Sequence, residues 1–119
     1  MPFARVFALI SIALAWNFAA AQPAGAPFPA KPLRMIVPFP PGGPTDLVGR
    51  AAATILSDAL GQPVVVDNRP GGNGTVGVGA LARSAPDGYT VGLTAITLAT
   101  APHLGKVPFD ALNDFAVIS

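Results

Sequence analysis

Polar side chains and glycines that could bind a small anion gather in residues 38–47 of this 119-residue chain. The segment reads Pro-Phe-Pro-Pro-Gly-Gly-Pro-Thr-Asp-Leu and stands between a short apolar run and a stretch with helical periodicity. Proline and glycine enforce a sharp turn, and the start of a helix exposes backbone N–H groups that suit an anion or a carboxylate. Gly42, Gly43, Thr45 and Asp46 are therefore candidate ligand-binding residues.

An ordinary structural role competes with binding at this first loop. Thr45 is a suitable helix N-cap, and Asp46 is favourable at the positive end of a helix, four residues before Arg50. For Asp46 taken alone we favour the structural role. For the loop as a whole we favour anion binding, because a plain connection seldom needs this much conformational control.

A second glycine-rich segment occupies residues 68–74. Residues 72–77 read Gly-Asn-Gly-Thr-Val-Gly and match the G-x-G-x-x-G pattern of dinucleotide sites. These glycines do not follow the preceding strand directly, because Asn68-Arg69-Pro70-Gly71 intervene. Asp87, the acidic residue nearest the required spacing, falls in a Pro-Asp-Gly turn. We therefore favour an amide-lined anion site at Gly72, Asn73 and Gly74. The alternative is a nucleotide-binding enzyme that uses Gly72, Gly74 and Gly77.

Two threonines, Thr94 and Thr97, follow a third apolar run. Their hydroxyls can bond a carboxylate directly or through water, but threonine is also a common strand residue, so both roles stay open. His103 is the only histidine and has no partner at a recognisable spacing. The sequence thus predicts no catalytic residues, no metal site and no cofactor, and the protein is not expected to be an enzyme.

The elements that must position these residues alternate along the chain. Strands are predicted at 33–37, 64–66 and 89–93, and helices at 46–60 and 75–84. This order favours an α/β fold with a parallel sheet and right-handed crossovers, which brings the three loops to the carboxyl edge of the sheet, where such folds bind ligands. The longer helix is expected to bury one apolar face, made of Leu47, Val48, Ala51, Ala52, Ile55, Leu56, Ala59 and Leu60.

The amino-terminal end of the chain indicates export, and the carboxyl-terminal end indicates a longer protein. Residues 1–21 have the basic, apolar and small-residue order of a cleavable signal peptide, and residues 22–32 are expected to be a flexible lead-in. Without Arg5, six basic residues face six aspartates, so no basic patch favours nucleic acid. The absence of cysteine excludes disulfides and a lipid-modified cysteine. Residues 114–119 resemble the opening of a fourth strand, which suggests a fragment of a longer protein.

Several ordered motifs carry a resemblance to a known family: Lys31–Asp46, Gly61–Gly74, Ala85–Thr90 and Pro108–Asp110. Together they resemble the Bug family of periplasmic substrate-binding proteins of tripartite tricarboxylate transporters. The resemblance implies a type II periplasmic-binding-protein fold, of which residues 33–119 supply only the first part of domain 1. The glycine common between the two threonines of the family is Ile96 here, which is a departure in the third loop.

The resemblance also implies a function and a site. It implies a periplasmic protein that captures a small organic carboxylate, such as a di- or tricarboxylate, for membrane subunits of a transporter. We expect the protein to be a soluble monomer. The cleft is expected to be lined by the loop Phe39–Asp46, by Gly72–Gly74 and by Thr94 and Thr97. Because the second domain would be missing, the chain alone is expected to bind weakly or not at all.

Overall fold

One parallel three-stranded sheet organises the computed structural model, which describes residues 25, 27–94 and 96–118. The strand order is β2–β1–β3, so the first strand is central. The strands are β1 (Leu33–Val37), β2 (Val64–Asn68) and β3 (Thr90–Gly92). The expected signal peptide lies outside the described residues, as does the beginning of the expected lead-in.

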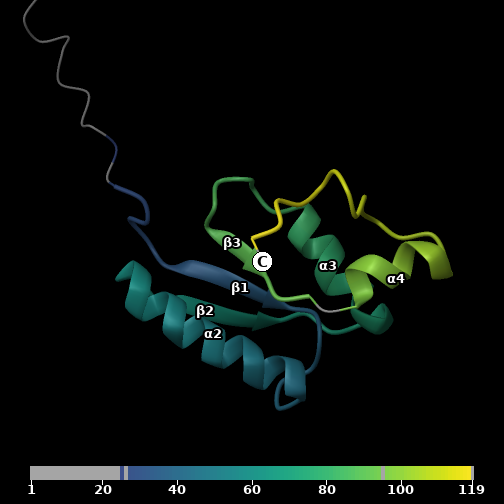
Figure 1. Cartoon of the computed structure of the whole chain (residues 1–119), viewed down its shortest axis with the longest axis horizontal. Helices are drawn as coiled ribbons and strands as arrows, with labels where there is room; N and C mark the ends of the chain where they lie inside the picture. Colours follow the sequence, from purple (N-terminus) through teal and green to yellow (C-terminus); the bar gives the residue numbers. More distant parts are fainter. Residues whose placement is uncertain (1–24, 26, 95, 119) are drawn as a thin grey trace, which may run out of the picture.

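Helices cover both faces of this sheet (Figure 1). One helix lies on one face, a second lies on the other, and the third packs against the second. In chain order they are α2 (Pro44–Leu60), α3 (Thr75–Ala82) and α4 (Thr97–Leu104), and a single turn of 3-10 helix, η2 (Gly72–Gly74), precedes α3. The predicted β-α-β-α-β order and the parallel sheet are confirmed.

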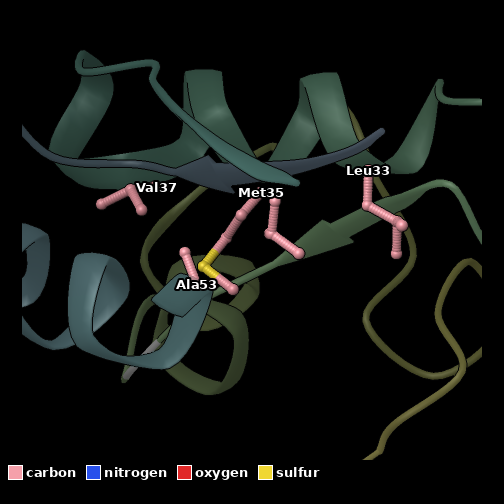
Figure 2. Close-up of a cluster of buried hydrophobic side chains, with 5 residues drawn as sticks. Leu33, Met35, Val37 and Ala53 are labelled. Atoms are coloured by element: carbon pink, nitrogen blue, oxygen red, sulfur yellow. The ribbon is translucent and has the colours of Figure 1, made fainter. Parts of the chain in front are cut away.

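The core between the sheet and α2 is built from alternate residues of β1. Leu33, Met35 and Val37 point to this side, where they pack with Ala53 and Val64 (Figure 2). Ile36 is buried as well, on the opposite face of the central strand. Burial on both faces explains why β1 reads as a nearly continuous apolar run instead of an alternating one.

The start of α2 differs from the prediction. The helix begins at Pro44 and its N-cap is Gly43, so Thr45 lies inside the first turn and is not the cap. Proline suits the first helical position because its missing N–H would have no partner there and its φ is already helical. The C-terminal stop is as predicted: Gly61 adopts a left-handed φ of 66° and its N–H donates to the carbonyl of Ser57.

The predicted buried face of α2 is partly wrong. Ala52, Leu56 and Leu60 do pack against the core. The other large members of that face are exposed, and the deeply buried positions are those of small residues and an aspartate: Asp46, Gly49 and Ala53. The reason is the close approach of helix and sheet: a Cβ added at Gly49 would lie 2.9 Å from Cγ2 of Val37. The helix turns its small residues inward, which leaves Leu47, Val48 and Ile55 in solvent.

A second, smaller core joins α3 to α4. It consists of Val78, Ala101 and Phe109, and Phe115 meets Phe109 edge-on with ring centroids 5.9 Å apart. The helix at 97–104 was not predicted. Beyond it, residues 115–118 form no strand, so the expected opening of a fourth strand is wrong for these residues. This segment instead follows turns around Asp110, which accepts bonds from the backbone N–H groups of Leu112 and Asn113.

The last part of the lead-in lies against Tyr89, just before β3. The Phe28 ring meets the Tyr89 ring edge-on with centroids 5.0 Å apart, and the N–H of Ala30 donates to the tyrosine hydroxyl at 2.9 Å. The ammonium of Lys31 lies 4.5 Å from the centre of the same ring. These contacts hold residues 28–31 at the amino ends of the strands.

Candidate functional site

The carboxyl edge of the sheet collects the starts of all three described α-helices. Each helix follows the carboxyl end of a strand, and no side chain caps any of the three helices. The first N–H groups of a helix lack intrahelical partners, and the helix dipole adds partial positive charge at that end. This rim is therefore electrostatically suited to an anion.

The Asp46 carboxylate is anchored within the protein at the side of this rim. Its Oδ2 accepts the N–H of Gly42 at 2.8 Å and the Nε–H of Arg50 at 2.9 Å, and its Oδ1 accepts from Nδ2 of Asn68 at 2.9 Å. The side chain is 3% exposed. The bond from Arg50, then those from Gly42 and Asn68, lower the pKa of Asp46 to about 2. An ionised carboxylate thus fixes the turn at Gly42, whose φ is +85°.

The second and third loops meet the first at one point. Thr97 is a buried residue, 3% exposed, and its hydroxyl donates to the carbonyl of Asn73 at 3.2 Å. Asn73 is the only described residue other than glycine with a positive φ, 52°. A Cβ added at Gly74 would lie 2.9 Å from the Thr97 hydroxyl oxygen and 3.4 Å from the Phe39 ring. Phe39, Gly74 and Thr97 are therefore in mutual proximity, and Thr97 supports the backbone of the glycine-rich loop.

Thr94 differs from Thr97 in its bonding. Its hydroxyl oxygen is buried and finds no hydrogen-bond partner among the described residues. A buried hydroxyl normally has a partner, so one without is available to a ligand or a water molecule.

The structure brings most of the predicted residues to one rim. Three groups lie there, namely Phe39 with Gly42 and Gly43 from the first loop, Gly72–Gly74 from the second, and Thr94 and Thr97 from the third. Thr45 and Asp46 belong to the first turn of α2. The sequence missed Asn68, because β2 runs two residues further than expected and ends on it. An amide side chain two residues after the β-branched run Val64–Val66 was the available clue.

The glycines of the G-x-G-x-x-G pattern have packing roles in this structure. A Cβ at Gly77 would lie 2.6 Å from Cβ of Pro38 and 2.7 Å from the carbonyl oxygen of Arg69. Gly74 meets Thr97 and Phe39 as described. These contacts account for Gly74 and Gly77 without a nucleotide. Within the described ranges, no three histidine, aspartate or glutamate side chains form a group that could hold a metal ion.

The fold and rim define a class of protein, the periplasmic binding proteins. The periplasmic binding protein BugD superposes with a TM-score of 0.71 and 43% sequence identity, over 74% of this chain and 30% of that one. MatC from Rhodopseudomonas palustris, whose structure has bound malate, gives a TM-score of 0.58 and 35% identity over 68% of this chain and 29% of MatC. The α/β domain described above is thus similar to part of the periplasmic-binding-protein fold, as predicted.

Sequence similarity then identifies the family. The model of the tripartite tricarboxylate transporter family receptor, TctC, matches residues 48–119, and the chain belongs to this family. Protein BugT of Bordetella pertussis is 43% identical over 122 residues, which cover 100% of this chain and 37% of BugT. The resemblance to Bug proteins is confirmed. The chain spans little more than a third of the length of this relative. None of the helices in the described part of the chain is long and apolar enough to cross a membrane.

Proposed function

We propose that this chain forms one wall of an exported receptor that binds a small organic carboxylate and presents it to the membrane subunits of a tripartite transporter. The observation that carries the proposal is the gathering of three uncapped helix starts on one rim of the sheet. Membership of the receptor family and the malate bound to MatC support it. The receptor works as a periplasmic monomer, and the ligand leaves chemically unchanged.

The donors of this rim favour a carboxylate over other small solutes. Backbone N–H groups at helix starts are neutral donors with a fixed direction, and they stabilise a compact anion without a paired cation. The one carboxylate beside them, Asp46, already accepts bonds at both oxygens, so it leaves little free negative charge to repel the ligand. Thr94 adds a hydroxyl that lacks a described partner.

The residues divide into two roles. Amides of Gly43, Gly72 and Asn73 and the hydroxyls of Thr45 and Thr94 contact the carboxylate. The N–H groups of Gly42 and Gly74 donate to Asp46 and to the carbonyl of Gly71, so these two glycines shape the rim. Phe39, Asp46 and Thr97 shape the rim, since their described contacts are with neighbouring loops. The remaining length of the relatives supplies the second domain and the opposite wall, so the chain alone binds weakly.

Titration of the 15N-labelled chain with malate, followed by NMR, tests this proposal. We expect millimolar malate to shift the amide signals of Gly43, Gly72 and Asn73, whereas the neutral polyol glycerol leaves them unchanged. Gly105 is the internal control, because it lies outside the rim and nothing in the structure would contact a Cβ added there. Signals that stay fixed at the rim, or that shift equally at Gly105, would refute the anion site.

A further inference from the structure

The side-chain amide of Asn68 bridges two elements that meet at the rim. Its Nδ2 donates to the carbonyl oxygen of Phe39 at 3.0 Å and to Oδ1 of Asp46 at 2.9 Å. Its Oδ1 accepts from Nη2 of Arg50 at 3.4 Å. Asn68 is the last residue of β2 and pairs with Val37, the last residue of β1. One amide therefore contacts the first loop and the first turns of α2 from the neighbouring strand.

We propose that Asn68 is a positioning residue that holds the first loop, residues 38–43, in the conformation that binds the carboxylate. This inference rests on the proposed function, because it assigns the loop conformation to binding. Nothing in the sequence pattern of the loop itself points to Asn68, which is 29 residues away from Phe39 along the chain.

The loop needs such a support because of its own composition. Three of its six residues, Pro38, Pro40 and Pro41, have no N–H to donate. Its Phe39 carbonyl and Gly42 N–H are instead bonded by side chains, the first by Asn68 and the second by Asp46. Since Asn68 also bonds Asp46, both of these anchors depend on the same amide.

An asparagine suits this position better than its close analogues. Its NH2 group donates twice and its carbonyl accepts once, which matches the carbonyl of Phe39, the carboxylate of Asp46 and the guanidinium of Arg50. Aspartate would have the same shape, but it would leave the Phe39 carbonyl without a donor and put a second carboxylate against Asp46. Alanine would remove all three bonds. A loop held in advance loses less conformational freedom when a ligand binds.

Amide hydrogen exchange of the whole chain, measured residue by residue by NMR, tests the inference. We expect Asn68→Ala to speed exchange of the Gly42 amide by about tenfold or more, because it loosens the acceptor of that N–H. Exchange of Leu33 and Arg34, whose N–H groups bond Pro63 and Tyr89 in the sheet, should stay unchanged. Asn113→Ala is the matched control, because it removes a side-chain amide that donates to a carboxylate, Asp110, at 2.8 Å in an exposed turn.

Three results would overturn the inference: a Gly42 rate that does not change in Asn68→Ala, a rate that rises as much in Asn113→Ala, or a rate that rises in parallel with those of Leu33 and Arg34. The last result would mean that Asn68 only supports overall stability. Asn68→Asp keeps the shape of the side chain but removes its donor, so it should also speed exchange of the Gly42 amide. Unchanged exchange of this amide in Asn68→Asp would count against the role of the Asn68 side chain as a donor.

Binding of malate supplies the second readout. We expect Asn68→Ala to weaken the malate-induced shifts of the rim amides several-fold at unchanged sheet protection, and Asn113→Ala to leave them as in the unaltered chain. If the unaltered chain shows no malate shifts, the proposed function fails, while the exchange comparison still decides whether Asn68 holds the loop.

Discussion

Replacement of Gly77 by alanine would place a methyl group where α3 passes closest to the first loop. An added Cβ at Gly77 would lie 2.6 Å from Cβ of Pro38, 2.7 Å from its Cα and 2.7 Å from the carbonyl oxygen of Arg69. Ordinary contacts begin at 3.4 Å, so the closest pair must separate by about 0.8 Å (3.4 minus 2.6). A proline ring and a backbone carbonyl cannot rotate away, and therefore the helix or the loop has to move.

The expected cost follows from two opposing terms. Overpacking of a filled site costs about 1–3 kcal/mol. Alanine inside a helix gains up to about 1 kcal/mol over glycine, which offsets part of that cost. We expect Gly77→Ala to lower the free energy of unfolding by about 1–2 kcal/mol. Each kcal/mol corresponds to a fall in Tm of about 4–8 °C for a domain of this size.

Thermal unfolding followed by circular dichroism measures this effect. Gly105→Ala is the matched control, because Gly105 has an extended backbone with φ of 165° and no atom within 4 Å of an added Cβ. Its Tm should change little, within the range of an ordinary surface substitution, about 0.5 kcal/mol. A Tm for Gly77→Ala equal to or above that of the unaltered chain would refute the close packing of α3 on the first loop.

Three further predictions concern the rim and the lead-in. The pKa of Asp46 is about 2 in the folded chain against an ordinary 3.8, so the stability that its ionised form contributes is present above about pH 4 and is lost as the pH falls towards 2. Between about pH 4 and pH 2, Tm should therefore fall less steeply in Asp46→Asn than in the unaltered chain. An equal slope would contradict the Asp46 network. Gly74→Ala should destabilise the chain in urea unfolding by about 1–2 kcal/mol, because φ is +92° and the Thr97 hydroxyl lies 2.9 Å from the added carbon, and unaltered stability would argue against this contact. Tyr89→Phe should cost about 0.5–1.5 kcal/mol and speed amide exchange of Ala30 alone, and a protected Ala30 would show that the tyrosine hydroxyl does not hold the lead-in.

The order of the elements could be predicted because each strand is a run of β-branched or apolar residues bounded by proline or glycine. Leu33–Val37 is the clearest case, and its parallel pairing follows from the intervening helix. The three loops then had to share one edge of the sheet. The sequence alone therefore predicts that the three loops lie side by side.

Long-range contacts set the features that the sequence did not reveal. The buried face of α2 depends on Gly49 fitting against Val37, whereas hydrophobicity favoured the larger residues that are exposed. The helix at 97–104 contains Pro102, which obscures helical periodicity, and it packs through Ala101 against Val78 of α3. The bridging role of Asn68 required a partner 29 residues away, which no local pattern indicates.

The contacts of Tyr89 with residues 28–31 have a practical consequence for handling the molecule. They hold residues 28–31 at the amino end of β1. The rim lies at the carboxyl end of that five-residue strand, roughly 15 Å away. A sensor surface, bead or fluorophore attached ahead of Phe28 would thus be joined at the pole opposite the rim. Immobilisation through that end should leave the candidate site open to solutes, whereas coupling through a thiol introduced by Asn73→Cys, at an exposed position of the glycine-rich loop, would obstruct it.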